Sequence, residues 1–369
     1  MIAPSKSTPA GFAAAHRVLL QAIHERAFPG AAYGVLREDE IFAVQSAGRF
    51  TYQPDALPVE PLTVFDMASV SKVMATTSMA MLLWQRRQLN LDRPVADILP
   101  DFVRFTPPDS PKRFVTPRML LAHSSGLPAY ERLYQCGPDR EALLNACLRM
   151  PLETDPDSRA VYSDIGFIVL GHLLEKLAGE SLDTFCQREV FLPLGMASTL
   201  YCPPAEMRSS IPPTRDEDRL GRGYVQGEVH DDNCWRLGGI SGHAGLFSNV
   251  ADTLRFAQCI LRKGSPVFDP EAIDRFTARQ AFPAPTSRAL GWDTPSKPSS
   301  SGDCFSLHSV GHLGYTGTSV WIDMEKHLAV VLLTNRTFPG DEQEGISQRI
   351  QQVRPLFHNA MMEALNACK

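Results

Sequence analysis

The distribution of strand-like segments along the chain is the feature that most constrains its fold. Near the N-terminus, residues 31–36 and 41–46 have the composition of two strands joined by a short turn. Near the C-terminus, residues 319–323 and 328–334 form a second such pair. The long stretch between the two pairs is mostly helical in pattern. We therefore expect an α+β fold in which both ends of the chain build one antiparallel sheet.

Apolar residues at helical spacing predict a first helix over residues 10–26 and a last helix over residues 356–368. These two helices should flank the sheet. Further helices are predicted at residues 69–89, 116–122, 140–149, 165–178 and 182–190.

The length of 369 residues suits one large catalytic domain with two lobes. We expect residues 1–62 and 245–369 to form a sheet lobe, and residues 63–244 to form a mainly helical lobe. Functional sites commonly lie in the cleft between two such lobes.

Composition excludes several classes of partner. The net charge is −5 and the basic residues are scattered, so neither nucleic acid nor an anionic membrane is expected to bind. No apolar run reaches the ~18 residues of a membrane span, and no secretory signal is visible. The eight cysteines form no CxxC pair and are expected to be thiols in a reducing compartment. The expected location is cytoplasmic, or periplasmic if a signal peptide has been removed.

The first motif with chemical potential is Ser69 followed by Lys72, three residues later. On a helix that starts at Ser69 the two side chains share one face. A lysine amine with a lowered pKa can take the proton of a serine hydroxyl and make it a nucleophile. The alternative is a capping serine beside a surface lysine.

The second motif is Tyr162-Ser163-Asp164, directly before the apolar helix that is predicted from residue 165. A tyrosine hydroxyl can relay protons beside a lysine, and a short polar side chain can hold both lysine and substrate. The alternative is an ordinary helix start, in which Ser163 or Asp164 is the N-cap.

The third motif is the glycine-rich run 311–319, which contains His312, Gly314 and Tyr315. Glycines allow a substrate to approach the backbone closely. Alone, the run could be no more than a strand with a bulge.

Together, in this order, the three motifs resemble the active-site motifs of the penicillin-recognising serine hydrolases. That superfamily comprises class C β-lactamases, penicillin-binding DD-peptidases and the family VIII esterases of β-lactamase fold. The similarity extends over roughly residues 28–335. Supporting phrases are Pro-Gly-Ala-Ala at 29–32, His-Ser-Ser-Gly-Leu-Pro at 123–128 and Gly-His-Ala-Gly-Leu-Phe-Ser at 242–248. The run 227–233 looks like the subgroup that contains a DD-carboxypeptidase-like penicillin-binding protein.

The resemblance implies a role for each matching residue. Ser69 would be acylated, Lys72 would activate it, and Tyr162 would shuttle protons to the leaving group and from water. The backbone N–H groups of Ser69 and Tyr315 would form the oxyanion hole. Neither a cofactor nor a metal is implied.

Two positions depart from the family pattern. Asp164 stands where many members carry asparagine, and His312-Leu313-Gly314 stands where Lys-Thr-Gly is usual. A histidine supplies only part of a positive charge at neutral pH. We therefore expect a small neutral ester or amide as substrate. A β-lactam or a D-Ala-D-Ala peptide is the alternative, and a β-lactam sensor without turnover is a further one.

Two other chemistries can be built from the same chain. A Ser-His-Asp triad could use Ser241 with one of several histidines, but no Gly-x-Ser-x-Gly elbow is present. A metal site could use His230, Asp231, Asp232 and His243, although their spacing is not of ligand type. The pair His308 and His312 falls in expected extended chain. The natural substrate and the oligomeric state are left open by the sequence.

Overall fold

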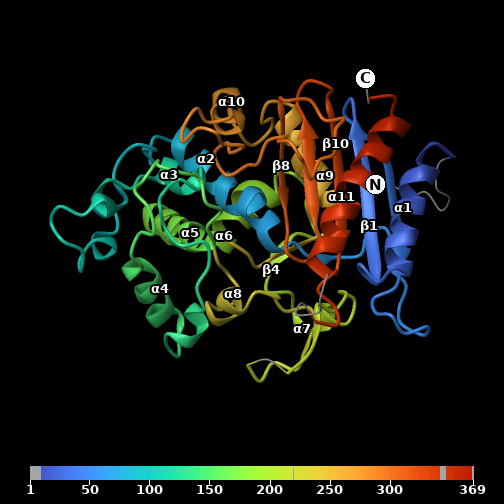
Figure 1. Ribbon diagram of the computed structural model, residues 1–369, viewed down its shortest axis with the longest axis horizontal. Helices are drawn as coiled ribbons and strands as arrows, with labels where there is room; N and C mark the ends of the chain where they lie inside the picture. Colours follow the sequence, from blue (N-terminus) through green and yellow to red (C-terminus); the bar gives the residue numbers. More distant parts are fainter. Residues whose placement is uncertain (1–9, 219, 341–345, 368–369) are drawn as a thin grey trace.

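The computed structural model describes residues 10–218, 220–340 and 346–367 (Figure 1). Its main sheet has five antiparallel strands in the order β2-β1-β10-β9-β8. The sheet therefore joins the two ends of the chain, as predicted. The strands are β1 (Gly30–Arg37), β2 (Glu40–Gly48), β8 (Ser309–Leu313), β9 (Ser319–Asp323) and β10 (Leu328–Thr334).

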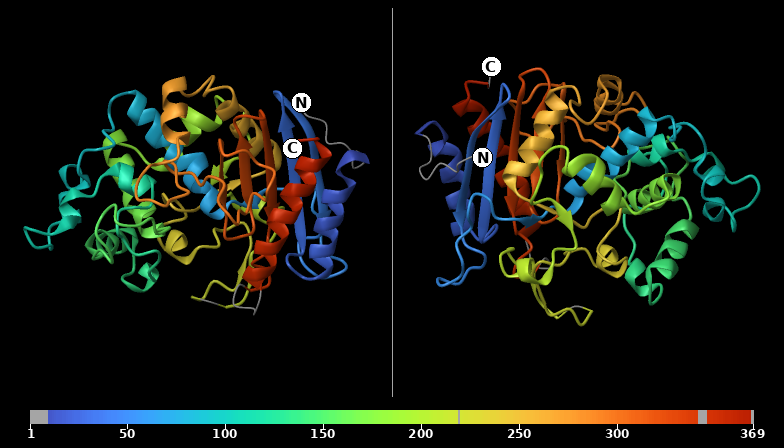
Figure 2. Two further views of the ribbon diagram at one scale, coloured as in Figure 1. Left: turned by 45° about the horizontal axis from the view of Figure 1, so that its top comes forward. Right: turned by 180° about the vertical axis from the view of Figure 1, so that it is seen from behind.

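Helices cover both faces of this sheet. α1 (Ala13–His24) and α11 (Ile346–Ala364) pack side by side on one face. α9 (Val250–Leu261) lies on the other face, as the view from behind in Figure 2 shows. Alternate residues of β1 serve the two layers: Tyr33 belongs to the cluster under α1 and α11, and Ala32 to the cluster under α9. This period of two explains why nearly every position of β1 is apolar.

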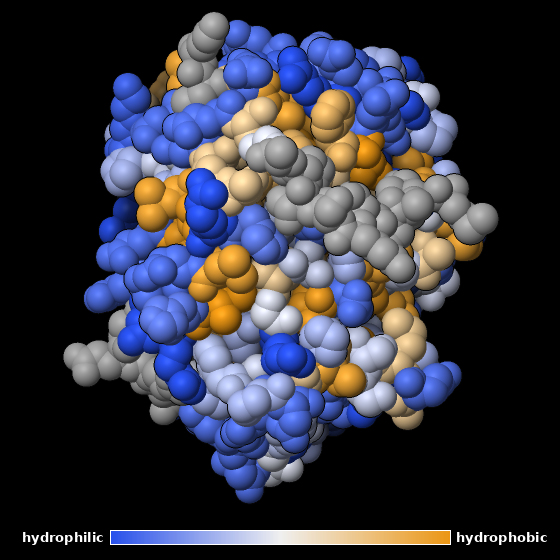
Figure 3. Space-filling model, turned by 90° about the vertical axis from the view of Figure 1, so that its right-hand side faces the viewer, coloured by the Kyte–Doolittle hydropathy of each residue, from blue (hydrophilic) through white to orange (hydrophobic). Residues whose placement is uncertain are grey.

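The outer side formed by α1 and α11 has hydrophilic and apolar side chains interspersed (Figure 3). Leu20 and Leu356 are among its exposed apolar residues. The larger apolar side chains of both helices, such as Leu19 and Phe357, are buried against the sheet.

The middle of the chain is mainly helical. Its central element is α5 (Asp164–Ala178), whose inner face is fully buried. Two small sheets accompany the helices, with strand orders β3-β7-β4 and β5-β6. The remaining elements are α2 (Ser78–Gln85), α3 (Pro117–Leu121), α4 (Arg140–Arg149), α6 (Leu182–Cys186), α7 (Ala205–Arg208), α8 (Asp232–Arg236), α10 (Pro270–Thr277), β3 (Phe65–Asp66), β4 (Leu200–Tyr201), β5 (Arg215–Asp216), β6 (Tyr224–Val225) and β7 (Leu246–Ser248). The proposed division into lobes at residues 62/63 and 244/245 stays a prediction.

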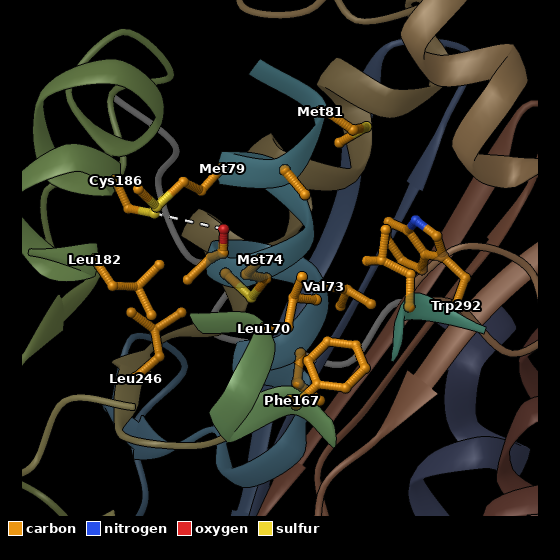
Figure 4. Close-up of a cluster of buried hydrophobic side chains, with 14 of the residues drawn as sticks. Val73, Met74, Met79, Met81, Phe167, Leu170, Leu182, Cys186, Leu246 and Trp292 are labelled. Carbon is orange, nitrogen blue, oxygen red and sulfur yellow. Dashed lines mark hydrogen bonds between the residues drawn. The ribbon is translucent and has the colours of Figure 1, made fainter. Parts of the chain in front are cut away.

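The helix that carries Ser69 is less regular than predicted. It begins as a 3-10 turn (Ala68–Val70), continues through a π-helical segment (Lys72–Thr77) and ends as α2 at Gln85. The expected end at residue 89 is wrong because Arg87 has a φ of 59°, which no α-helix accepts. The segment is buried among the apolar side chains shown in Figure 4, where Cys186 also donates to the carbonyl of Ala75.

The last helix also differs from its prediction. It starts at Ile346, ten residues before the expected start at residue 356. The helix passes through Pro355, which lacks an N–H donor and usually interrupts a helix.

The cysteines correct another expectation. Six described cysteines are free thiols, but Cys304 is disulfide-bonded. A pattern of distant cysteines without CxxC therefore did not exclude a disulfide. Within the described ranges, no helix is both long enough and apolar enough to span a membrane.

Candidate active site

The turn that carries Ser69 follows directly from β3 and is held from several sides. Ala68 has a φ of 45°, so the backbone is strained one residue before the serine. The buried carboxylate of Asp66 accepts the Ala68 N–H at 2.8 Å and the His230 N–H at 2.7 Å. Thr318 donates to the carbonyl of Met67 at 3.0 Å. These bonds fix the half-buried Ser69 at the start of the helix.

Lys72 lies beneath Ser69 and is completely buried. Its ammonium nitrogen donates to Ser69 Oγ at 3.0 Å, to Asp164 Oδ1 at 2.6 Å and to the carbonyl oxygen of His243 at 2.9 Å. Three acceptors satisfy the three N–H donors of an ammonium group. The contacts therefore favour the charged form of Lys72.

The charge state of Lys72 corrects the expectation that its pKa would be lowered. Burial is the largest single influence and acts to lower the pKa of Lys72, but the charge and hydrogen bond of Asp164, together with Tyr162, outweigh it. The net result is a raised pKa. The departure from asparagine at position 164 thus matters for the lysine itself, because only a carboxylate supplies this charge.

Tyr162 occupies the position before α5 that the second motif predicted. Its ring centre lies 4.9 Å from the Lys72 nitrogen. Burial raises the pKa of Tyr162, while the charge of Lys72 partly opposes the rise. Ser163 Oγ accepts the Gly166 N–H at 2.9 Å and is the N-cap of α5. The capping interpretation is therefore confirmed for Ser163, while the catalytic role of Tyr162 and the binding role of Asp164, which accepts from Lys72, stay predictions.

His312 lies on β8, buried beside Tyr162 at 5.9 Å between ring centroids. Its Nδ1 is 2.8 Å from the carbonyl oxygen of Leu313, so Nδ1 carries the proton and Nε2 is left as an acceptor. Burial, followed by the charges of Lys72 and Arg288, holds the pKa of His312 well below its usual value. The expected partial positive charge at this position is therefore wrong; His312 is neutral.

The end of β8 comes close to the serine turn. A Cβ on Gly314 would lie 1.9 Å from Thr318 Oγ1 and 2.6 Å from the Met67 carbonyl oxygen, so only glycine fits there. Arg354 of α11 donates to the carbonyls of Gly314 and Thr318 and supports this turn from below. Tyr315 is half-exposed, and its ring stacks on that of His230.

All seven predicted residues converge on one pocket of about 780 Å³. Ser69, Tyr162, Asp164, His312, Gly314 and Tyr315 line it, and Lys72 lies beneath Ser69. A pocket of this volume suits a ligand of drug or dipeptide size.

The residues that suggested a metal site, His230, Asp231, Asp232 and His243, take part in separate hydrogen-bonded groups. His243 Nε2 lies 2.8 Å from Asp231 Oδ1, and His243 Nδ1 lies 2.9 Å from Ser241 Oγ. Asp232 instead accepts from the buried guanidinium groups of Arg215 and Arg222. The four residues are therefore not gathered around one point.

The same bonds line up Ser241, His243 and Asp231 in the order of a hydrolase triad. However, Ser241 is buried and does not line the pocket that contains Ser69. The backbone carbonyl of His243 accepts from Lys72, so this group supports Lys72 from behind.

The sequence reasoning missed the arginines of the pocket, namely Arg215, Arg288, Arg336 and Arg354. They come from four separate segments, and no spacing in the sequence connects them to the three motifs. Only their common place in the pocket identifies them.

Comparison with known proteins identifies the family. A model of the Beta-lactamase family matches residues 15–354. The N-acetylmuramyl-L-alanine amidase of Bacillus subtilis is 33% identical over 344 residues, covering 84% of this chain and 77% of the relative. A protein of Escherichia coli K12 that is named a D-alanyl-D-alanine carboxypeptidase is 30% identical, covering 74% of this chain and 69% of its own length.

A solved structure confirms the fold class. The octameric penicillin-binding protein homologue of Pyrococcus abyssi superimposes with a TM-score of 0.73 at 20% identity, covering 95% of this chain and 77% of that chain.

Proposed function

Because this chain belongs to the β-lactamase family of serine hydrolases, we propose that it cleaves the amide bond of a small alanine-containing cell-wall fragment through an acyl-enzyme on Ser69. The observation that carries the proposal is the hydrogen bond from Lys72 to Ser69 Oγ, with the Tyr162 ring next to the Lys72 nitrogen, at the base of one pocket. The two similar proteins are named for amide cleavage next to alanine, which supports an amide rather than an ester.

In the proposed acylation, Ser69 Oγ attacks the amide carbon and its proton passes to the Tyr162 oxygen. Tyr162 gives its own proton to the amide nitrogen, the C–N bond breaks, and the amine leaves. Lys72 stays an ammonium and stabilises the negative charge that develops on the two oxygens it faces. A neutral Tyr162 can act in this way because it gains one proton as it loses another.

In deacylation, water adds to the acyl carbon, and its proton returns through Tyr162 to Ser69 Oγ. The products are a carboxylic acid and the free enzyme. The backbone N–H groups of Ser69 and Tyr315 are proposed to hold the oxyanion in both steps, with Gly314 leaving room for it.

A neutral ester is the second candidate, because a neutral His312 offers no charge to a carboxylate. A β-lactam, turned over or bound once as by a sensor, would use the same serine.

Mass spectrometry of intact protein and small molecules tests the proposal. The protein is incubated with N-acetylmuramyl-L-alanine, N-acetyl-D-alanyl-D-alanine, a penicillin and an ester panel. We expect hydrolysis of at least one of the two amides, and none by Ser69→Ala. Ser158→Ala, an exposed serine outside the pocket, is the matched control. Undiminished amide hydrolysis by folded Ser69→Ala would refute the mechanism. Hydrolysis of esters alone would refute the proposal that the substrate is an amide.

For location, we propose the cytoplasm, because six described cysteines are free thiols. The disulfide at Cys304 makes the periplasm the alternative, and cell fractionation decides between the two.

A further inference from the structure

A second cavity, of about 440 Å³, lies outside the pocket that contains Ser69. It is a groove formed by α6, by the π-helical turn that follows α6 (Gln187–Phe191) and by β4. The described residues that line this groove are all different from those that line the active-site pocket. The groove is therefore a separate place at which a ligand can bind.

The segment from α6 into the following turn has two faces with different surroundings. Leu182 and Cys186 belong to the buried apolar cluster around the helix that carries Ser69 (Figure 4). Asp183 and Gln187 each follow one of these residues directly and are four positions apart, so they share a neighbouring face. That second face lines the groove and brings polar groups to it.

Of the two charged residues described in the groove, only Asp183 lacks a partner. Arg188 donates to Glu180 at 2.7 and 2.8 Å and to Glu189 at 2.9 Å, so its charge is compensated. Asp183 makes no ion pair or side-chain hydrogen bond with any described residue, and its Oδ1 is buried. A buried carboxylate oxygen without a donor costs free energy, which a bound donor would recover.

Two neutral groups of the groove also lack partners. Tyr201 is 8% exposed, and among the described residues its hydroxyl, which is buried, finds no hydrogen-bond partner. The side-chain amide of Gln187 likewise makes no hydrogen bond to the described part of the chain. Carboxylate, hydroxyl and amide oxygens all accept from N–H donors. Buried polar groups normally have partners, so this set indicates a ligand that brings donors.

The rest of the groove is apolar. Phe191 is buried, Leu200 is partly buried, and Leu192 is 63% exposed. An apolar ligand body that covered Leu192 would remove exposed apolar surface from water. The groove thus combines an uncompensated negative charge with an apolar wall.

We propose that this groove binds a small organic cation, namely a primary ammonium group on a short apolar body. The ammonium group donates to Asp183, and the apolar body covers Leu192. The active site shows the same chemistry within the chain, because the ammonium of Lys72 donates to a hydroxyl, a carboxylate and a carbonyl oxygen. The inference does not rest on the proposed function, since the residues of the groove have no part in the acyl-enzyme.

Ligand-observed NMR titration of the full chain with benzylamine, whose amine is protonated at pH 7, tests the proposal. The wild type should bind benzylamine with a Kd of about 1 mM, a reasonable affinity for a ligand of this size. Benzyl alcohol has the same shape without the charge and should bind about tenfold more weakly. Asp183→Asn should raise the Kd of benzylamine about tenfold and leave that of benzyl alcohol unchanged. Leu192→Ser should weaken both ligands about threefold, because it removes apolar contact and no charge.

Asp155→Asn is the matched control, since Asp155 is an exposed acid that lines neither cavity, and it should bind benzylamine as the wild type does. Thermal unfolding without ligand checks that each variant is folded. A wild type that binds neither ligand, or binds both equally, overturns the inference whether or not Asp183→Asn folds. An unchanged Kd of benzylamine in folded Asp183→Asn overturns it as well. Neither result bears on amide hydrolysis by Ser69.

Discussion

Two buried lysines in this molecule show how differently the same side chain is treated in the cleft and away from it. Lys72 donates to Ser69, Asp164 and the His243 carbonyl. Lys112 is also buried, but donates only to the backbone carbonyls of residues 148 and 150, at 2.7 and 2.6 Å, and lies 4.3 Å from the Phe102 ring centre. Lys72 therefore contacts a carboxylate, whereas Lys112 contacts backbone carbonyl dipoles and the aromatic ring of Phe102.

The pKa values of the two lysines move in opposite directions. Burial lowers the pKa of Lys112 to about 8. Burial also acts to lower the pKa of Lys72, but Asp164, through its charge and its hydrogen bond, and Tyr162 together raise it. The comparison shows that burial alone does not set the charge of a lysine, and that Asp164 decides the state of the one beneath Ser69.

The largest expected effect is the difference in activity between two single variants, in which either Lys72 or Lys112 is replaced by methionine. Lys72→Met should reduce kcat/KM on the order of 10⁴-fold, as removal of a partner of a nucleophile does. Lys112→Met should retain the wild-type rate in the folded fraction, because Lys112 does not line the pocket. Steady-state kinetics with an amide substrate measure kcat/KM of both variants. Equal losses of kcat/KM in the two variants would contradict the proposed difference between the two lysines.

Tyr162, like Asp164, distinguishes the surroundings of Lys72 from those of Lys112. Tyr162→Phe removes only the hydroxyl and keeps the ring that lies 4.9 Å from the Lys72 nitrogen. We expect a rate loss of about 10²–10⁴-fold, the usual range for removing a proton-transfer group. Single-turnover kinetics measure acylation separately, and a loss below about tenfold would take Tyr162 out of the relay.

Asp164→Asn should make Lys72 resemble Lys112. The burial of Lys72 remains while the carboxylate charge is lost, so its pKa should fall. If the ammonium form is the working form, activity is lost as pH rises through this lowered pKa. The alkaline limb of kcat/KM should therefore move to lower pH, with a rate loss of about tenfold above that limb.

Asp155→Asn, an exposed acid outside the pocket, is the control for the pH profile. An alkaline limb that stays in place in Asp164→Asn would mean that the charge of Lys72 does not depend on Asp164.

The smallest effect concerns stability alone. Lys112 has a folded pKa of about 8 against an ordinary value of 10.5. Between these values the unfolded chain binds more protons, so the contribution of Lys112 to the free energy of unfolding rises with pH, by at most ~3 kcal/mol. Urea unfolding of wild type and Lys112→Met at pH 7.5 and pH 10 measures the difference. A gap between the two proteins that does not change with pH would contradict the lowered pKa.

Much of the fold could be predicted because its signals are local. The two hairpins, the N-cap before α5 and the spacing of Ser69 and Lys72 each depend on a few neighbouring residues. The irregular helix from Ala68 to Gln85 could not be predicted. Its π-helical segment is held by packing against parts of the chain distant in sequence, such as Cys186 and Phe167 (Figure 4).

The active site likewise has a part that could be predicted from the sequence and a part that could not. The residue types and their order along the chain predict Ser69, Lys72 and Tyr162 as site residues, and the structure brings them together. The sequence by itself also identified positions 164 and 312 as departures from the family pattern.

Only the tertiary structure decided what these departures do. A pKa depends on burial and on charges within a few ångströms, and those charges come from segments far apart in sequence: Asp164 is 92 residues from Lys72. The same holds for Arg288, which reaches the pocket only because its segment pairs with the edge of β8. Local pattern specifies which groups are present, while the folded chain sets their distances, their solvation and hence their charge.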